Sequence, residues 1–326
     1  MDYPILSNCL VKKAWLLALL VCSLSGQKPP KPDTTHNDVV AEMSDLPVIF
    51  IHTGYSDYLQ QTLRQAKKFN KRVILISDTQ KNCSGIDVEF HDIADYNKDV
   101  EKITKPYAAL TRQKHLLLAI QRWFVIKSFM RQNKLSLCFF CDSDVLLYTN
   151  VGEAARKYYP FDLAITGDAS RKTSCNNRRI YGGMSAFCTF GVVEDICSFL
   201  TTLPNNKDTW SFFKKSVEER TCLFGEMVVI SHYILEHGAQ RFNIKNLCHK
   251  VDSSCFDSFL FSSGDEKFDQ EDFLFKKDNF LVKKLSWVDG CPYAIKKDTH
   301  TKIRLLSLHF HSKYKVLIPL FFKQHA

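Results

Sequence analysis

Two aspartates separated by one residue, Asp142-Ser143-Asp144, are the strongest chemical signal in the sequence. They follow an apolar run at residues 135–140. Carboxylates at alternate positions where a strand ends point to the same side, so this pair can share one hard divalent cation through oxygen ligands. The apolar strand would place the two charges at the carboxyl end of a sheet, where a positive charge must neutralise them. The alternative is a solvated turn in which each Asp caps its own backbone.

A second candidate lies close to the C-terminus, where a strand-like run at residues 305–310 contains His309 and leads to His311 and Lys315. An imidazole nitrogen added to carboxylate oxygens favours manganese over calcium. A lysine ammonium can meet a diphosphate as a point charge. Taken alone, the two histidines fit ordinary satisfied side chains of a late strand better than ligands.

Periodic apolar residues predict the elements that must position these groups. Two short apolar strands separated by a helical pattern form a βαβ unit at residues 48–78, whose strands must be parallel. One long helix, without Gly or Pro, leads into the strand that precedes Asp142. The predicted strands are 48–51, 73–76, 135–140 and 163–166, and the predicted helices are 55–69, 107–132, 155–159, 207–219 and 224–237.

Strands and helices in alternation predict an α/β fold with a mostly parallel central sheet flanked by helices. Ligands of such sheets bind beyond the carboxyl ends of the strands. This rule gathers residues 52–55, residues 77–78, residues 142–144 and Asp168 around one site.

The charge pattern gives no sign of nucleic-acid binding. The chain has 326 residues, a formal net charge of +9 and 45% hydrophobic residues, enough for a sizeable core. Its basic residues occur in scattered pairs and never form a run of five or six. With no recognition motif beside them, a nucleic-acid partner is not expected.

The N-terminus predicts a secretory address. Lys12-Lys13 precede a short apolar stretch at 14–24, and a Pro-rich polar segment follows. Such a stretch is short for a bilayer span, which favours a cleaved signal peptide over a signal anchor. We therefore expect a signal peptide or short anchor at 1–26 and a linker or stem at 27–45. The protein would lie in the Golgi or ER lumen or be secreted, with membrane contact only through an uncleaved anchor.

Twelve cysteines suit an oxidising compartment, although their connectivity cannot be read from the sequence. Asn82-Cys83-Ser84 is an N-glycosylation sequon, so the sequence also predicts a glycoprotein.

Several of these segments, in this order, resemble one known family. Residues 48–55, Arg122-Trp123-Phe124, residues 141–148 and residues 308–315 look like the DxD glycosyltransferases of the GT-A nucleotide-diphospho-sugar transferase superfamily. The last segment is similar to the His-Phe-x-Gly-x-x-Lys ending of the glycogenin and lipopolysaccharide galactosyltransferase group. The likeness covers most of residues 46–318, so it implies a GT-A-like catalytic domain at 46–326.

The resemblance implies a UDP-sugar donor whose diphosphate meets a divalent metal, manganese, held by Asp142, Asp144 and His309. A glycan, protein or lipid would be the acceptor. Ser312 stands where the family has Gly, and no Pro-Trp follows Lys315. The residues expected to contact the donor are Thr53, Gly54, Tyr55, Asp78, Arg122, Ser143, Gly183 and Lys315.

For the acceptor side the sequence offers two carboxylates, Glu226 and Asp257, with Glu226 preferred as a general base. Gly183 lies in Tyr181-Gly182-Gly183-Met184, which resembles the segment lining the donor sugar. Its glycines allow close backbone approach to a ligand, although a tight turn explains them equally well. Likeness to the glycogenin group favours transfer with retention of configuration.

Two other functions stay open. A sugar nucleotidyltransferase shares this kind of sheet, although such enzymes usually carry a Gly-rich loop after the first strand and only Gly54 occurs here. A secreted carbohydrate-binding or interaction protein would carry an inert site, against which the intact Asp142, Asp144 and His309 argue.

Overall fold

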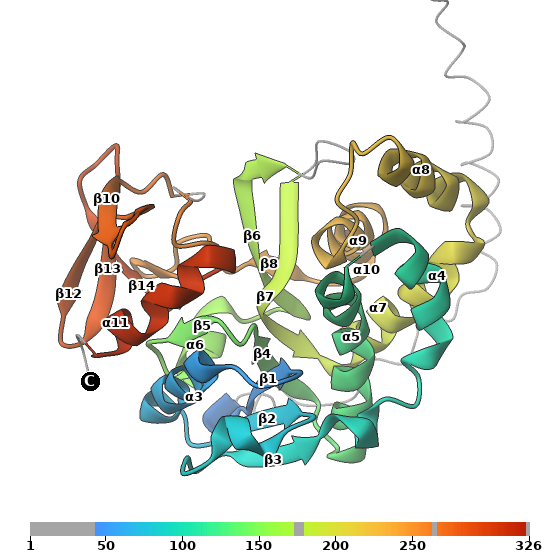
Figure 1. Ribbon diagram of the computed structural model, residues 1–326, viewed down its shortest axis with the longest axis horizontal. Coiled ribbons are helices and arrows are strands. Elements are labelled where there is room, and N and C mark those ends of the chain that lie inside the picture. The colour runs from blue at the N-terminus through green and yellow to red at the C-terminus, as the bar shows by residue number, and fades with distance from the viewer. Residues whose placement is uncertain (1–42, 112, 173–178, 263–265, 324–326) are drawn as a thin grey trace, which may run out of the picture. The chain divides into compact units, whose positions relative to one another are not determined.

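The computed structural model describes residues 43–111, 113–172, 179–262 and 266–323 (Figure 1). The compact unit considered below spans Val40–Ala326. The predicted signal segment at 1–26 and residues 27–42 of the predicted linker lie outside the described residues. Met43–Asp45, the last residues of that linker, form the 3-10 helix η1, in which Met43 is buried. No helix within the described ranges is both long and apolar enough to cross a membrane.

A seven-stranded sheet forms the centre of the fold, in the order β3-β2-β1-β4-β7-β6-β8. Parallel pairs join β1 to β2 and β4, β2 to β3, and β6 to β8, whereas β7 runs antiparallel to both of its neighbours. The predicted α/β fold with a mostly parallel central sheet is therefore confirmed. In sheet order the strands are β3 (Glu89–Asp92), β2 (Val73–Ser77), β1 (Val48–His52), β4 (Leu137–Cys141), β7 (Arg179–Thr189), β6 (Leu163–Lys172) and β8 (Ile244–Asn246).

Helices flank this sheet, as expected from their apolar stripes (Figure 1). The main ones are α3 (Asp57–Phe69), α4 (Glu101–Thr111), α5 (Lys114–Gln132), α6 (Val151–Tyr158), α7 (Phe190–Thr202), α8 (Lys207–Glu218) and α9 (Glu226–Tyr233). Shorter turns are η2 (Gln80–Cys83), η3 (Ile93–Tyr96), η4 (Leu203–Asn205), the π-turn η5 (Ile234–Gly238) and α10 (Ala239–Arg241).

The single helix predicted at 107–132 is wrong, because the chain forms α4 and α5 there instead. Gln113, the N-cap of α5, has an extended backbone, which separates the two helices. They pack side by side, and the Gln121 amide donates a hydrogen bond to the Thr104 hydroxyl at 2.8 Å. The break lies in the polar run at residues 111–115, which contains no Gly or Pro to mark the end of a helix.

Further strands follow α10 and carry the C-terminal part of the site. They are β9 (Ser254–Cys255), β10 (Gln270–Phe275), β11 (Asp278–Lys283), β12 (Leu285–Val288), β13 (Cys291–Ile295), β14 (Lys302–Leu305) and β15 (Ser307–His309). β15 pairs antiparallel with β5 (Val145–Leu147), so His309 lies opposite Val145. The chain then forms η6 (Ser312–Leu317) and α11 (Ile318–Lys323).

The core beneath the site is rich in aromatic side chains. Trp123 of α5 and Phe140 of β4 are both buried and meet edge to face, with ring centroids 5.0 Å apart. A second buried cluster, which includes Leu146, Leu308 and Phe310, packs around β5 and β15. The two segments that carry Asp144 and His309 are therefore anchored on rigid, packed strands.

The predicted glycosylation sequon is not available in the folded protein. Asn82 has no exposed surface. Its amide nitrogen donates to the Gly54 carbonyl at 2.8 Å, and its amide oxygen accepts from the Ser56 backbone at 3.1 Å. A glycan on this nitrogen would remove a buried hydrogen bond and would have no space. The structure therefore argues against Asn82 as a glycosylation site.

Asp99 gives a pH-dependent prediction for the α4–α5 region. Its carboxylate contacts Lys102 at 2.8 Å and Lys127 at 3.0 Å, and these hydrogen bonds lower its pKa to about 2. A lowered folded-state pKa stabilises the fold above the unfolded pKa, and this contribution is lost as the pH falls towards 2. Asp99→Asn should thus unfold at a lower temperature than the wild type at pH 7, with the gap closing at pH 2–3. Thermal unfolding of both proteins between pH 2 and pH 7 measures this difference in unfolding temperature. A difference that did not change with pH would contradict the prediction.

Candidate metal and diphosphate site

The Asp142-Ser143-Asp144 segment forms a tight turn between β4 and β5. The Val145 backbone N–H donates to the Asp142 carbonyl at 3.1 Å, which closes the turn. Asp144 is only 5% exposed, and its carboxylate contacts charged side chains. The alternative of a solvated turn whose aspartates cap their own backbone therefore does not describe Asp144.

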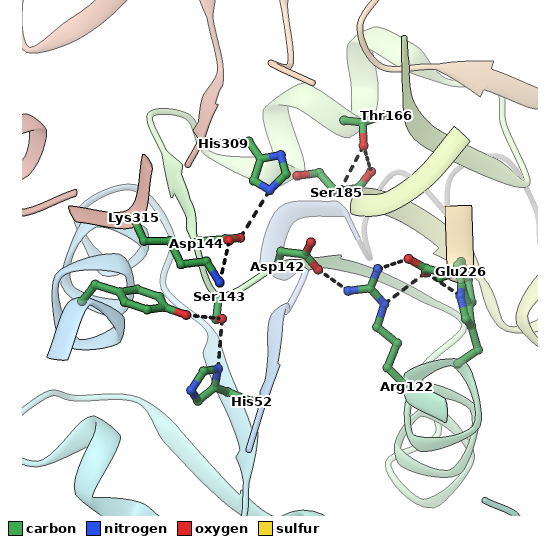
Figure 2. Close-up of polar contacts among 12 residues, drawn as sticks. His52, Arg122, Asp142, Ser143, Asp144, Thr166, Ser185, Glu226, His309 and Lys315 are labelled. Atoms are coloured by element: carbon green, nitrogen blue, oxygen red, sulfur yellow. Dashed lines mark hydrogen bonds and ion pairs between the residues drawn. The ribbon is translucent and has the colours of Figure 1, made fainter. Parts of the chain in front are cut away.

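His309 reaches this turn from β15, as Figure 2 shows. Its Nδ1 lies 2.6 Å from the Ser258 carbonyl, which can only accept a hydrogen bond, so Nδ1 must carry the proton. Nε2 then points at Asp144 Oδ1, 3.4 Å away. Nε2 is buried and has no hydrogen-bond partner within the described part of the chain. An imidazole lone pair facing a carboxylate oxygen requires a positive charge, supplied by a proton or by a metal ion.

Electrostatics around Asp144 reflects this requirement. Burial alone would raise the pKa of the Asp144 carboxyl, but His309 and Lys315 outweigh it and hold that pKa well below its usual range. Burial would likewise lower the pKa of His309, whereas the charge of Asp144 raises it. This cluster therefore favours negative charge on the Asp144 carboxylate and positive charge beside it.

Lys315, in η6, is the other cation at this carboxylate. Its Nζ lies 3.1 Å from Asp144 Oδ2 and 5.4 Å from the centre of the Tyr58 ring. Burial acts to lower the pKa of Lys315, but Asp144 raises it above its ordinary value, so the ammonium stays charged. His311, next along the chain from Phe310, is exposed.

Ser143 is held by residues of β1 and α3. Its hydroxyl forms a hydrogen bond with His52 Nδ1 at 3.0 Å and a longer one with the Tyr58 hydroxyl at 3.4 Å. His52 Nε2 is bonded in turn to the Ser56 hydroxyl at 3.0 Å. These contacts fix the middle of the turn from the opposite side to His309.

Arg122 links Asp142 to Glu226 (Figure 2). The Arg122 guanidinium makes short contacts with both carboxylates, and its Nε donates to Glu226 Oε1 at 3.1 Å. The Trp123 indole N–H also donates to Glu226 Oε1, at 2.8 Å. Glu226 is 6% exposed at the start of α9, and burial raises its pKa despite Arg122. These contacts describe a carboxylate that orients Arg122 and, through it, Asp142.

Asp257 lies behind His309. Its Oδ1 accepts from Lys283 Nζ at 2.6 Å, and both side chains are almost completely buried. Its Oδ2 accepts from the His309 backbone N–H at 3.0 Å. Lys283 Nζ also donates to the Phe259 carbonyl at 2.6 Å. Asp257 therefore holds the backbone of a candidate metal ligand, while its role towards an acceptor stays a prediction.

The loop after β1 lies beside the same edge of the sheet. Gly54 adopts a left-handed backbone (φ 76°), which favours glycine, and its N–H donates to Asp78 Oδ1 at 2.8 Å. Thr53 and Tyr55 are exposed, and Lys81 Nζ lies 4.4 Å from the centre of the Tyr55 ring. Thr53, Gly54, Tyr55 and Asp78 thus lie together, as the sequence predicted, while their contact with a nucleotide stays a prediction.

Gly183 lies in β7, and the side chains around it at 168–184 are outside the described set, as is that of Asp168. Two residues further along β7, Ser185 pairs with Cys141, the residue before Asp142. The backbone N–H of Ser185 donates to the Thr166 hydroxyl at 3.2 Å. The strand that contains Gly183 therefore pairs with β4, which precedes Asp142, and Ser185 is the paired residue nearest to Gly183.

Asp142, Asp144 and His309 each offer one ligand atom, and these atoms lie within 4.8 Å of one another. Two carboxylate oxygens and one imidazole nitrogen form a mixed donor set that suits a divalent cation such as Mn²⁺. The Ser258 carbonyl supplies the outer hydrogen bond that metal-bound histidines almost always have. The residues present therefore fit a divalent metal.

The solved structures compared below are remote likenesses of this chain. No protein-family model matches the chain, and no curated protein matches it in sequence. HddC from Yersinia pseudotuberculosis is 11% identical over 46% of this chain and 79% of its own, with a TM-score of 0.29. CMP:2-keto-3-deoxy-manno-octonic acid synthetase, solved with CTP, is 8% identical over 54% of this chain and 87% of its own, also with a TM-score of 0.29.

A glycosyltransferase involved in glycosylation of the major capsid of PBCV-1 is 12% identical over 54% of this chain and 76% of its own, with a TM-score of 0.28. TM-scores this low establish no relationship. Function must therefore be argued from the geometry of the site itself.

Two contributors, Tyr58 and Lys283, were not predicted from the sequence, and each for a physical reason. The Tyr58 hydroxyl reaches Ser143 from a helix, where a lone Tyr carries no distinguishing pattern. His52 was expected at this edge of the sheet, but its hydrogen bond to Ser143 was not. Lys283 is one of two consecutive lysines at the end of a late strand, and a lysine there is normally expected to be exposed to solvent. Only the fold shows that it is buried against Asp257.

Proposed function

We propose that this protein is a metal-dependent glycosyltransferase of the secretory pathway, which moves a sugar from a UDP-sugar to a glycan, protein or lipid acceptor. The observation that carries the proposal is the meeting of Asp142 with the buried Asp144 and His309, in which His309 Nε2 lies 3.4 Å from Asp144 Oδ1. The sequence resemblance supplies the donor class. Manganese is the cation proposed, since its ligand preferences match this mixed set.

The residues of the chain would act mainly by holding positive charges close to the diphosphate. A bound divalent cation would stabilise the negative charge that develops on a departing diphosphate. Lys315 would add a second positive charge beside Asp144, and Arg122 would hold Asp142 in position. Preorganised charges of this kind need no rearrangement as the donor bond breaks.

Neither predicted acceptor-side carboxylate is poised as a base. Glu226 is held by Arg122 and Trp123, and Asp257 by Lys283 and the His309 backbone. An attack that inverts configuration needs such a base. These contacts therefore support the retaining course that the resemblance implied, in which Glu226 and Asp257 act as positioning residues.

The secretory location rests on the sequence of residues 1–32 and on one further observation. Cys222 is disulfide-bonded, as suits an oxidising compartment. Other cysteines, such as Cys83 and Cys291, are not bridged in the described structure. The disulfide thus supports the proposed secretory location, although not every described cysteine forms one.

Calorimetric binding of UDP to the purified protein, with and without Mn²⁺, tests the proposal. We expect binding that depends on Mn²⁺ and falls at least about tenfold in Asp144→Asn, because a neutral amide is a much weaker ligand. Asp87→Asn, at a carboxylate with 98% side-chain exposure, is the matched control and should bind as the wild type. Hydrolysis of UDP-sugars should then show which sugar is carried.

Two other outcomes would indicate a different function. Release of pyrophosphate from a nucleoside triphosphate and a sugar phosphate would indicate a sugar nucleotidyltransferase instead. Failure of every nucleoside diphosphate to bind, with or without Mn²⁺, would leave an interaction protein with an inert site.

A further inference from the structure

Asp144 has a different cation candidate at each of its two oxygens. Oδ1 faces His309 Nε2 at 3.4 Å, and Oδ2 faces Lys315 Nζ at 3.1 Å. A divalent ion shared by Asp142, Asp144 and His309 would therefore lie within a few ångströms of the Lys315 ammonium. Two positive charges this close repel each other strongly where water is excluded.

Lys315 differs from the other members of the cluster in its freedom to move. The side chains of His309 and Asp144 are 1% and 7% exposed, whereas that of Lys315 is 38% exposed. Its ammonium lies on a flexible four-carbon stem in η6. The ring of Tyr58, 5.4 Å from Nζ, borders it on the α3 side. Lys315 is thus the solvent-side member, whose ammonium can withdraw into water once another cation neutralises Asp144.

We propose that Lys315 is an exchangeable internal cation of this site, an inference that rests on the metal and diphosphate binding of the proposed function. Its ammonium neutralises Asp144 until a divalent cation takes over that carboxylate. Lys315 then turns to the diphosphate that arrives with the cation. The same side chain therefore opposes binding of the metal alone and favours binding of metal and diphosphate together.

This exchange predicts effects of opposite sign in one variant. Lys315→Met removes the competing charge, so Mn²⁺ alone should bind about tenfold more tightly. The same variant loses a charge on the phosphates, so UDP at saturating Mn²⁺ should bind about tenfold more weakly. Free Mn²⁺ followed by electron paramagnetic resonance gives the first affinity, and calorimetry gives the second.

Controls separate charge from packing. Lys313→Met makes the same change two residues earlier, at an exposed lysine over the Phe280 ring, and should alter neither affinity. Lys315→Arg keeps the charge and should retain the weaker Mn²⁺ binding. Lys315→Gln is a second neutral variant that should repeat the Lys315→Met result if the methionine variant fails to fold.

Each result bears on a distinct claim. If wild type and neutral variants bind no Mn²⁺ at all, the metal site of the proposed function is wrong and the exchange falls with it. Equal or weaker Mn²⁺ binding in the neutral variants, with clear binding in the wild type, would overturn the exchange alone. Tighter Mn²⁺ binding with unchanged UDP affinity would also overturn it, because Lys315 would then never reach the diphosphate.

Discussion

Lys283→Met is expected to be among the most damaging single substitutions in this protein. Lys283 and Asp257 form an ion pair in which both side chains are almost completely buried, and the substitution removes the lysine charge. A buried charge left without its partner typically costs about 3–5 kcal/mol of folding free energy. Denaturant unfolding followed by fluorescence should show a loss of that size. The exposed neighbour Lys284 provides the matched control, since Lys284→Met should change stability by less than about 0.5 kcal/mol.

A double variant distinguishes the ion pair from simple packing. Lys283→Met combined with Asp257→Asn removes both charges, so it should recover much of the lost stability. Asp257→Asn keeps an oxygen for the His309 N–H but weakens that charge-assisted hydrogen bond. We therefore expect the double variant to fold yet bind Mn²⁺ more weakly than the wild type. A double variant as unstable as Lys283→Met would show that packing, and not charge, is responsible.

The Lys283–Asp257 pair also shows where sequence reasoning ends. Asp257 was singled out as a carboxylate for the acceptor, because carboxylates are the usual bases. In the fold its two oxygens are directed at Lys283 and the His309 backbone. Both partners lie more than 25 residues from Asp257 in the chain, so no local sequence pattern could have indicated these contacts. Such contacts are determined by the tertiary structure, while a role of Asp257 towards an acceptor stays a prediction.

The sheet and the Asp142 turn were more accessible to prediction, because local patterns determine them. Apolar runs ending in polar residues located β1, β2 and β4 to within about two residues. The rule that parallel strands share a carboxyl edge then brought Gly54 and Asp78 together, and their hydrogen bond confirms that placement. The approach of His309 was harder, since it depends on β15 pairing with β5 across some 160 residues, and only the family resemblance suggested it.

Arg122 is the second position where a large effect is expected. Arg122→Met leaves Glu226 buried without its guanidinium partner and Asp142 without its anchor. The loss of stability at pH 8 should be about 3–5 kcal/mol, as for other broken buried pairs. Arg131→Met, on the same helix, removes an exposed pairing with Glu194 and should cost less than about 1 kcal/mol.

The pH dependence of the Arg122 variant identifies the cause. Burial already raises the pKa of Glu226, and loss of Arg122 should raise it further. A carboxyl whose folded-state pKa exceeds its unfolded value binds more protons in the native state, so stability falls as the pH rises through that interval. Arg122→Met should therefore regain stability on acidification from pH 8 towards pH 5, relative to the wild type. Adding Glu226→Gln should remove most of this dependence, whereas a slope that persisted in the double variant would place the titrating group elsewhere.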